Sequence, residues 1–446
     1  MRLFIEGGRF ARVMLAFRKL PVGELQGSYF PLDGLTRYGP FEELRMLRLI
    51  HIIPEQPLEL RRRIERIKEN LVRTIKDNLR SICRVEHLHL DERNVEDIGP
   101  TGIEELKEQI KSAAKADEPT VILLPIFREV LGMYNARYVY YVTKGLSLSH
   151  GVSTQVYTEN TESRILNVGD YYTILNLSLN IFSKAGGVPW ALYDKLGANV
   201  LVGMNWSFLR EERRTGPVTK VFAFAQTFDD GGVYRNMYAT VAPEDRYIDG
   251  LKTIINEAVE ETKRKVGLVE NVAILTAKRL KREELCILAE ELNGINLYIA
   301  LISDSIGIRA FNTSDRYYLI DRGTFFFLSD RKAFYAPQGV IEGVSRRIMG
   351  TPVLVKVELL HPLGATAKDN RQKLLELVKM VHAMTVMNWR TFMGLSRLPA
   401  PLHYAKLVSI FVREFTRFRA IKDAFPNIRK GLLEPHGRVR DKPWFL

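Results

Sequence analysis

The stretch YYVTKGLSLSHGVSTQVY, Tyr140 to Tyr157, combines a tyrosine, a lysine and a glutamine in what we interpret as a short turn. Lys144 follows Tyr140 by four residues, and Gln155 lies beyond two glycines. A buried core segment would avoid these side chains. An anion binds to such a set, through a lysine charge, amide and phenol hydrogen bonds, and a ring on which a base stacks. The spacing alone also fits a solvated helix, so the surrounding sequence has to decide.

Strand-like and helix-like patterns alternate before this stretch. Short apolar runs are separated by segments with apolar residues at three- and four-residue spacing, which is typical of amphipathic helices. The order is a strand LRLIHII (47–53), a helix LELRRRIERIKENLVRTIKDNLRSIC (58–83), an extended segment ending in HLHLD (87–91), a helix (99–117) and a strand TVILLPIF (120–127). This alternation predicts a parallel sheet covered by helices, in which ligands bind at the carboxyl ends of the strands.

A second α/β segment begins after residue 190. Three strands are predicted at 198–208, 218–228 and 231–242, the last two antiparallel around the turn at Asp230. Helices are predicted at 247–265 and 281–293, and an apolar strand follows each of them. The last hundred residues are predicted to be mainly helical. We therefore predict an α/β fold with N-terminal strands and turns over 1–45, one domain over 46–190 and a second over 191–446.

Composition narrows the class of protein. The chain has 446 residues, 46% of them hydrophobic, and no apolar run reaches the roughly 18 residues of a spanning helix, so we expect a protein without a membrane span. The first thirty residues lack the pattern of a secretory signal, and the two cysteines lie far apart, so we expect a reducing, cytoplasmic location. The net charge of +13 favours an anionic partner, most simply nucleic acid.

Four segments together resemble the Mid and Piwi domains of Argonaute proteins. They are Tyr-x-x-x-Lys with the downstream Gln-Val, NLSLNIFSKAGGVPW (176–190), LPAPLHYAKLVSIFVREF (398–415) and DGLTRYGPFEE (33–43). The last is similar to a segment of short prokaryotic Argonautes, which lack the separate N and PAZ domains. The resemblance implies a Rossmann-like Mid domain over 46–190 and an RNase H-like Piwi domain over 191–446.

The resemblance implies a pocket for the 5′ phosphate of a guide strand. Tyr140 would stack on the first base, and Lys144, Gln155 and Lys184 would contact the phosphate. One position departs from the family pattern, because Asn180 stands where many members have a further lysine. The resemblance also implies a Mg²⁺ ion shared by the phosphate, Gln155 and the terminal carboxylate at Leu446, although a tail that simply packs on the surface is an equal alternative.

The positions of the Piwi metal-binding carboxylates carry other residues. By the resemblance, Asn205, Lys278 and Lys406 stand where slicing members have acidic or histidine ligands, and no pattern between Glu244 and Glu261 selects the remaining glutamate. Two lysines would repel the cations that two-metal chemistry needs, so we expect no catalytic residues. His87 and His89 flank Leu88 on one strand face, and we interpret them as strand residues, not metal ligands.

A basic helix is predicted to contact the nucleic-acid backbone. Lys406, Arg413 and Arg417 are seven and four residues apart and therefore share one helix face, although a solvated face is the alternative. The family resemblance implies an inactive protein that binds a guide RNA or DNA, recognises a complementary DNA or RNA target, and acts in prokaryotic defence through a separate effector or an APAZ-type partner. The alternatives are a guided nuclease with a rearranged site and an RNA-binding protein without a guide.

Overall fold

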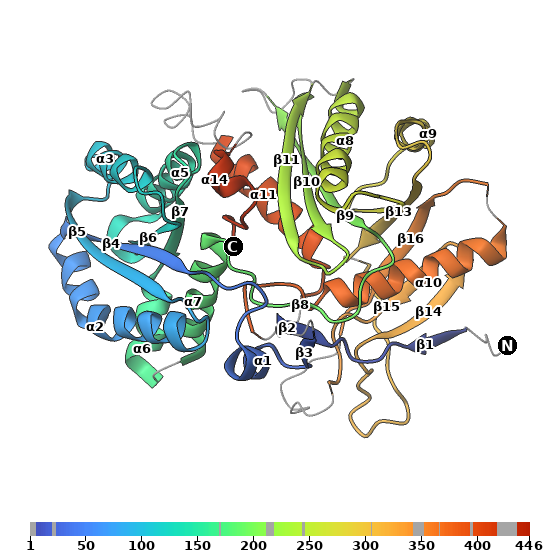
Figure 1. Ribbon diagram of the computed structural model, residues 1–446, viewed down its shortest axis with the longest axis horizontal. Coiled ribbons are helices and arrows are strands. Elements are labelled where there is room, and N and C mark those ends of the chain that lie inside the picture. Colours follow the sequence, from blue (N-terminus) through green and yellow to red (C-terminus); the bar gives the residue numbers. More distant parts are fainter. Residues whose placement is uncertain are drawn as a thin grey trace. The chain divides into compact units, whose positions relative to one another are not determined.

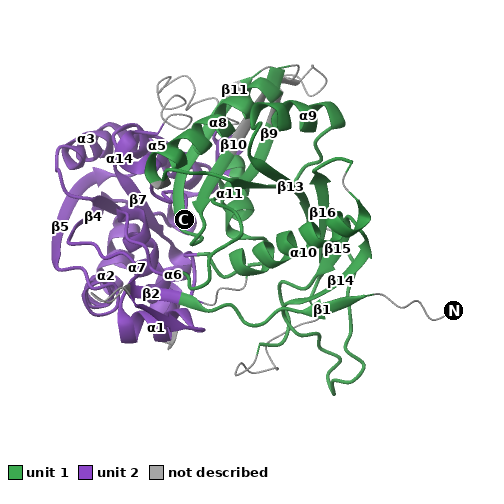
Figure 2. Ribbon diagram, turned by 45° about the vertical axis from the view of Figure 1, so that its right-hand side comes forward, with its two compact units in different colours: residues 1–15, 192–388, 393–410 green, residues 16–191, 389–392, 411–446 purple. Residues whose placement is uncertain are grey.

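The computed structural model describes residues 6–19, 24–168, 171–210, 218–242, 246–304, 306–341, 352–364, 366–392, 396–416 and 435–446 (Figure 1). The chain divides into two compact units (Figure 2). Unit 1 comprises residues 1–15, 192–388 and 393–410, and unit 2 comprises residues 16–191, 389–392 and 411–446. Each unit therefore contains segments that are far apart in the sequence.

Unit 2 is built on a parallel sheet, as predicted. Its described strands are β4 (Met46–Gln56), β5 (His87–Asp97), β6 (Thr120–Pro125) and β7 (Ser153–Tyr157), in the order β5-β4-β6-β7 with every neighbouring pair parallel. All six residues of β6 are buried, because this strand is central and helices cover both faces of the sheet. The carboxyl ends of β6 and β7 lie side by side, since Pro125 is paired with Tyr157.

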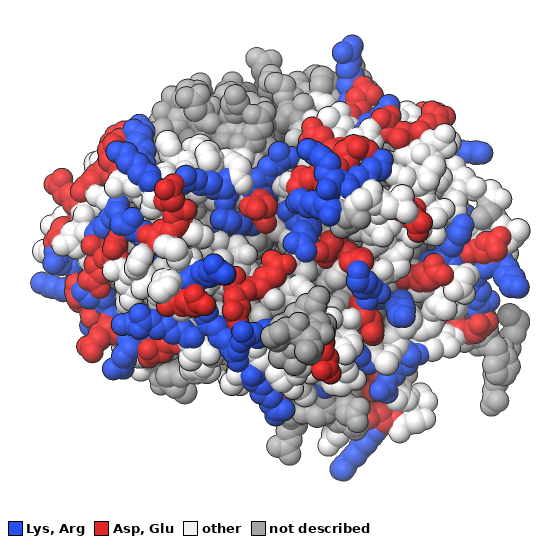
Figure 3. Space-filling view, in the orientation of Figure 1, with Lys and Arg blue, Asp and Glu red and all other residues white. Residues whose placement is uncertain are grey.

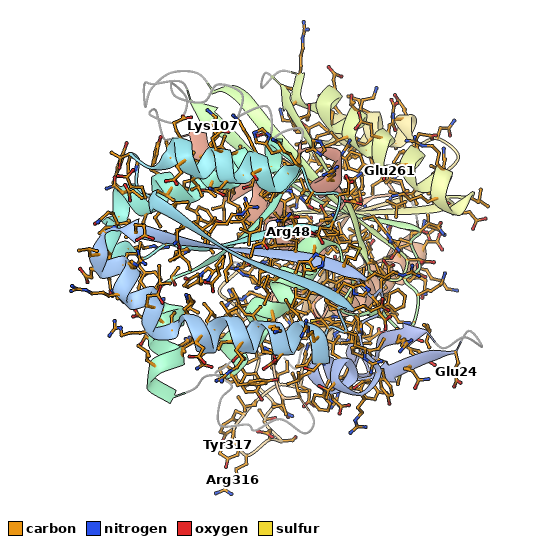
Figure 4. The ribbon with its side chains drawn as sticks, turned by 60° about the vertical axis from the view of Figure 1, so that its left-hand side comes forward. Glu24, Arg48, Lys107, Glu261, Arg316 and Tyr317 are labelled. Atoms are coloured by element: carbon orange, nitrogen blue, oxygen red, sulfur yellow. The ribbon has the colours of Figure 1, made fainter. Side chains whose placement is uncertain are left out.

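Helices cover both faces of this sheet. On one face lie α2 (Leu58–Ser81), α6 (Glu159–Val168) and α7 (Tyr171–Ala185), and on the other lie α3 (Ile103–Ala114), α4 (Arg128–Leu131) and α5 (Met133–Ser149) (Figures 1 and 4). The α2 helix buries Leu60, Ile64, Ile67, Leu71 and Ile75 at three- and four-residue spacing. Each such side chain contributes about 1.5–3 kcal/mol by leaving water, which fixes α2 on the sheet.

The stretch from Tyr140 to Tyr157 is not a short turn. Tyr140 and Lys144 lie within the 17-residue helix α5, and Gln155 lies in the strand β7. The helix continues through this stretch because its apolar residues, including Val139 and Val142, are buried at helical spacing. The chain reverses only after Ser149, where Gly151 has a φ of +75° that favours glycine.

The N-terminal region contains more than strands and turns. Besides β1 (Gly7–Arg9), β2 (Leu15–Lys19) and β3 (Leu25–Ser28), it forms the helix α1 (Pro31–Tyr38). Pro31 begins this helix, where its missing N–H costs no hydrogen bond, and Asp33 pairs with Arg37 one turn on at 2.8 Å. The strand β8 (Ala191–Leu192) pairs with β2 in a small sheet of order β3-β2-β8.

Unit 1 is built on a mixed sheet of nine described strands. Their order is β1-β14-β15-β16-β13-β12-β9-β10-β11, and only the neighbours β9–β12 and β12–β13 are parallel. The further strands are β9 (Val200–Arg210), β10 (Val218–Asp229), β11 (Tyr234–Ala242), β12 (Asn271–Thr276), β13 (Asn296–Ser303), β14 (Thr324–Ser329), β15 (Lys332–Tyr335) and β16 (Val355–His361). The antiparallel pair β10–β11 confirms the hairpin predicted at Asp230.

Helices α8 (Tyr247–Val266) and α9 (Arg282–Glu291) pack on one face of this sheet, and the main core of unit 1 lies beneath them. The helix α10 (Ala367–Met384) begins at Thr366, whose hydroxyl accepts from the Asp369 amide. The helix α11 (Ala400–Thr416) approaches β9 closely at Gly203, because a Cβ there would lie 2.0 Å from the Pro401 carbonyl carbon. Gly203 therefore sets the distance between α11 and the strand that carries Asn205.

One segment of unit 1 projects from the surface. The segment between β13 and β14 extends away from the sheet, with Arg316 and Tyr317 at its end (Figure 4). Within the described ranges, no helix is long and apolar enough to cross a membrane.

Candidate functional site: an anion pocket in unit 2

The residues of the predicted phosphate pocket meet in one cavity of unit 2. This cavity has a volume of about 580 Å³ and lies at the carboxyl ends of β6 and β7. Its lining includes Tyr140 and Lys144 from α5, Gln155 from β7 and Lys184 from the last turn of α7. Three separate elements thus bring together side chains that the sequence places up to 44 residues apart, between Tyr140 and Lys184.

The two lysines are buried side by side. Lys144 is 4% exposed and Lys184 is 1% exposed. Both ammonium groups donate to the Thr154 carbonyl oxygen, at 2.7 Å from Lys144 and 3.1 Å from Lys184. Lys184 also donates to Gln155 Oε1 at 2.6 Å, which holds the glutamine side chain in place. The acceptors of these two amines are neutral oxygens, and within the described chain neither amine pairs with a carboxylate side chain.

Burial is the main cause that lowers the pKa of both lysines. Burial lowers the pKa of Lys144 to about 7, and Arg390 contributes to the decrease. The pKa of Lys184 is also lowered well below its usual value, first by burial and then by the nearby Lys144 and Arg390. A cavity that buries two adjacent amines, with no aspartate or glutamate in its described lining, gains stability when an anion enters, because the anion offsets the cost of burying their charge.

The charge of the lining is entirely positive among the described side chains. It contains five basic residues and no aspartate or glutamate: Arg128, Arg137, Lys144, Lys184 and Arg390. Arg137 at the rim pairs with Glu414 at 2.6 Å, whereas the two lysines lie deeper. A phosphate group with two negative charges fits this lining better than a neutral or cationic ligand.

Tyr140 provides an aromatic surface in the same cavity. Its ring is half-buried and makes edge contacts with Tyr141 and Phe411, with ring centroids 5.2 and 5.9 Å apart. Burial raises the pKa of the Tyr140 hydroxyl to about 12, so the phenol stays protonated and can donate a hydrogen bond. The structure therefore places a ring next to the anion-binding lysines, as base stacking requires.

The C-terminal tail forms one wall of the cavity. The Trp444 carbonyl accepts a hydrogen bond from Lys144 Nζ at 2.9 Å, and Leu446 lines the cavity. Trp444 is buried against Phe411, with ring centroids 5.7 Å apart. Before the tail, Arg438 lies in the short helix α14 (Gly437–Arg440). Its side chain donates to the carbonyl of Ala114, the last residue of α3, and to that of Ala116 just beyond. The predicted tail is thus anchored inside unit 2, not loosely packed on its surface.

The sequence analysis missed three basic residues of the lining, Arg128, Arg137 and Arg390, of which Arg390 comes from the most distant segment. Its segment, residues 389–392, is held in unit 2 because Trp389 donates to the Trp190 carbonyl at 3.2 Å and the Phe392 amide donates to Asn176 at 3.1 Å. No motif in the sequence marks Arg390, because its segment lies far from α5 in the sequence and reaches the cavity only in the folded chain. In the segment WRTF (389–392), the only feature that could have marked a buried site is the tryptophan, in a region predicted to be mainly helical.

Asn180, which departs from the family pattern, lies one turn before Lys184 on α7. It is buried, and its Oδ1 has no hydrogen-bond partner in the described part of the chain. A buried acceptor without a donor destabilises the ligand-free protein. The position therefore provides a polar group near the pocket but no positive charge.

The protein side chains do not form a magnesium site on their own. Gln155 Oε1 already accepts from the Lys184 ammonium, and a cation there would face two buried lysines. Across the described residues, no three side chains of His, Cys, Asp or Glu gather as metal ligands. The Mg²⁺ ion predicted at Leu446 and Gln155 thus stays a prediction, and no step below depends on it.

Two of the positions predicted to replace catalytic carboxylates, Asn205 and Lys278, lie near the carboxyl end of β12 in the sheet of unit 1. Asn205 is on β9, which runs parallel to β12 with Met204 paired to Thr276, and Lys278 follows β12 by two residues. The Lys278 ammonium donates to the Trp206 carbonyl and lies 5.2 Å from the centre of the Trp206 ring. Burial lowers the pKa of Lys278 to about 8. Asn205 and Lys278 are therefore close in space.

Lys406 lies on α11, the helix that packs against Gly203 on β9. Its ammonium is 3.5 Å from Asp304, which follows β13. On the same helix, Arg413 pairs with Glu414 at 3.2 Å, so both cations of the predicted basic stripe have acidic neighbours. Arg417 and, within the region from Glu244 to Glu261, Glu244 lie outside the described residues, and nothing selects one glutamate of that region, so the stripe and the missing glutamate stay predictions.

Solved structures of Argonaute proteins are similar to the chain. A structure of Clostridium butyricum Argonaute bound to a guide DNA (5′ deoxycytidine) and a 19-mer target DNA matches with a TM-score of 0.66 and 17% identity, covering 92% of this chain and 53% of that chain. A crystal structure of A. aeolicus Argonaute matches with a TM-score of 0.61 and 17% identity, over the same 92% and 53%. No protein-family model and no curated protein matches. The chain thus spans about half the length of these structures and shares their fold.

Proposed function

We propose that this chain, which has the fold of Argonaute proteins, binds a 5′-phosphorylated nucleic-acid guide in the unit 2 cavity and uses it to recognise a complementary target. The observation that carries the proposal is the buried pair Lys144 and Lys184, held only by neutral oxygens in a cavity without acidic side chains. Such a pair is costly in the empty protein and favourable beside a phosphate dianion.

The cavity also favours binding of the guide by its phosphorylated 5′ end. A terminal phosphate can present three free oxygens to the buried lysines, whereas an internal phosphate continues into the chain on both sides. Tyr140 then stacks on the first base, and Arg390 adds a third cation near the phosphate. The same arrangement accepts RNA or DNA, because the contacts that we assign involve the phosphate and a base face, not a 2′-hydroxyl.

We propose further that the protein does not cleave its target. Two-metal cleavage needs a cluster of carboxylates, whereas near the carboxyl end of β12 the chain has Asn205, within β9, and Lys278, two residues after β12. Lys406 adds a second cation on α11, and a positive charge at a metal site raises the cost of binding Mg²⁺. The output is then recognition, and a separate effector or APAZ-type partner in prokaryotic defence would convert recognition into a response.

The deciding experiment measures binding of four labelled strands, RNA and DNA with a 5′ phosphate or a 5′ hydroxyl, at fixed salt and with Mg²⁺ or EDTA. We expect the phosphorylated strands to bind at least tenfold more tightly, by about 1.5–3 kcal/mol, which is the range for hydrogen bonds to charged groups. Equal binding of all four strands would favour an RNA-binding protein without a guide. Cleavage of a guided target would instead favour a nuclease with a rearranged site.

A further inference from the structure

A second cationic surface lies in unit 2, on the helix α2. Five basic residues form this α2 stripe: Arg62, Arg66, Arg73, Lys76 and Arg80. They recur at intervals of three, four or seven residues and therefore share one face of the helix. This face points away from the sheet, because the residues that α2 buries, such as Ile64 and Leu71, lie on its opposite side.

Most of the stripe has no ionic partner. Arg66 pairs with Glu162 at 2.9 Å, but Arg62, Arg73, Lys76 and Arg80 make no ion pair or side-chain hydrogen bond within the described ranges. Three acidic residues of α2 lie three or four positions from stripe residues, but within the described ranges none of them forms an ion pair with those four cations: Glu65, Glu69 and Asp77. Lysines elsewhere in unit 2 behave differently, since Lys107 and Lys111 on α3 each pair with a glutamate three residues earlier, at 2.8 and 2.6 Å.

The stripe is accessible and extended. Arg62, Arg73 and Arg80 are exposed, and from the first to the last residue the stripe is about 27 Å long at 1.5 Å per residue. Figure 3 shows basic side chains over α2 at the lower left of the face in view, with acidic ones between them. Like charges one turn apart on a helix repel each other and weaken it. An extended polyanion that follows the helix would remove this repulsion.

We propose that the α2 stripe binds the sugar–phosphate backbone of a nucleic acid, without reading its sequence. A line of unpaired cations of this length matches a regular series of phosphates better than it matches a single anion. Arginine supplies four of the five charges, and its planar group suits phosphate oxygens. The stripe is separate from the guide pocket, because no residue of α2 lines that cavity.

The test uses the full chain and a short blunt DNA duplex with 5′-hydroxyl ends, which offers no terminal phosphate to the guide pocket. The variant carries R62Q, R73Q and R80Q, since glutamine removes the charge, stays polar and has a helix propensity close to that of arginine. The matched control carries K68Q, K107Q and K111Q, which removes the same charge from lysines that have glutamate partners in unit 2. Circular dichroism establishes that both variants remain folded.

The readout is duplex affinity between about 50 and 200 mM salt. Three lost phosphate contacts are expected to make the slope of log K against log salt shallower by about 2.7, whereas the control keeps the slope of the unmodified protein. Equal losses in variant and control would overturn the proposal, because duplex binding would then reflect net charge alone. An unchanged slope in the variant would overturn it as well.

This outcome is independent of the guide pocket. A variant with K144M that loses its preference for 5′ phosphate but keeps the salt slope of duplex binding separates the two sites. If the guide pocket fails its own test, the α2 stripe is still decided by the duplex measurement. If the stripe fails, the preference for a 5′ phosphate is unaffected, because the stripe contributes no residue to the cavity.

Discussion

The ammonium groups of Lys144 and Lys184 share one acceptor, the carbonyl oxygen of Thr154, at 2.7 and 3.1 Å. Two cations are thus held close together inside the protein by a neutral oxygen at the edge of a parallel sheet. An arrangement of this kind is costly in the empty state, because both charges are desolvated and repel each other. The site is therefore prepared to bind an anion.

Replacing Lys144 by methionine should abolish the preference for 5′-phosphorylated strands. The variant loses a charged donor that lies inside the cavity, so affinity for the phosphorylated strand should fall by about 1.5–3 kcal/mol, roughly 10- to 100-fold. Affinity for the 5′-hydroxyl strand should change far less. Fluorescence anisotropy with both strands measures this, and K107M on α3 provides the control. Equal losses for both strands would remove Lys144 from the phosphate site.

The affinity for phosphorylated guides should fall as pH rises above about 7. The pKa of Lys144 is lowered to about 7 in the ligand-free protein, so above this pH the empty site must take up a proton to bind phosphate as an ion pair. The ionisable groups that line the cavity with Lys144 include Lys184, Arg390 and Tyr140. Isothermal titration in buffers of different ionisation enthalpy, between about pH 7 and 9, should show proton uptake. Pure electrostatic screening without proton uptake would contradict the assignment.

The ligand-free protein should become more stable when Lys144 is replaced by methionine. Because the pKa of Lys144 in the folded state lies below the usual 10.5, the unfolded chain binds more protons between about pH 7 and 10.5, and stability rises with pH across this window. Removing the buried charge should raise the free energy of unfolding near neutral pH by about 1–4 kcal/mol and flatten this rise. Urea unfolding at two pH values measures both effects. A clear loss of stability would mean that the hydrogen bonds to Thr154 and Trp444 outweigh the burial of the charge.

Truncating Trp444 should damage both stability and guide binding. Its side chain is buried against Phe411, and its carbonyl accepts from Lys144, so Trp444→Ala removes a large core side chain next to the pocket. We expect a loss of about 3–5 kcal/mol in the free energy of unfolding and a weaker preference for the 5′ phosphate. Trp444→Phe, which keeps most of the packing, should retain the preference. Loss of preference in both variants would assign the effect to the indole itself.

No cleaved product is expected from a guided, labelled target in Mg²⁺ or Mn²⁺. Asn205, Lys278 and Lys406 offer no carboxylate at the positions that would bind the ions, and the Lys278 ammonium is held against Trp206. Gel analysis of target strands, with and without a matching guide, measures this. A guide-dependent product that disappears with EDTA would overturn the proposal and direct attention to other acidic residues of unit 1.

The alternation of strands and helices over residues 46–127 was predictable, because the apolar periods of 2 and 3.6 are local properties of the sequence. The residue types of the pocket were predictable as well, through the spacing of Tyr140, Lys144 and Gln155 and the resemblance of the flanking motifs. The same local view misread the stretch itself. It treated Tyr140 to Tyr157 as a turn, because charged residues are rarely buried, whereas the structure buries Lys144 in a helix.

The sequence alone determined which residues favour strands and helices, the excess of positive charge, and the lack of carboxylates at Asn205, Lys278 and Lys406. Only the tertiary structure decided that Lys144 and Lys184 share one acceptor, that Trp444 covers them and that Arg390 joins the cavity. These contacts join residues as much as 300 positions apart. No local pattern encodes such a distance, because it arises when separate segments bury their apolar faces in one core and bring their polar ends together.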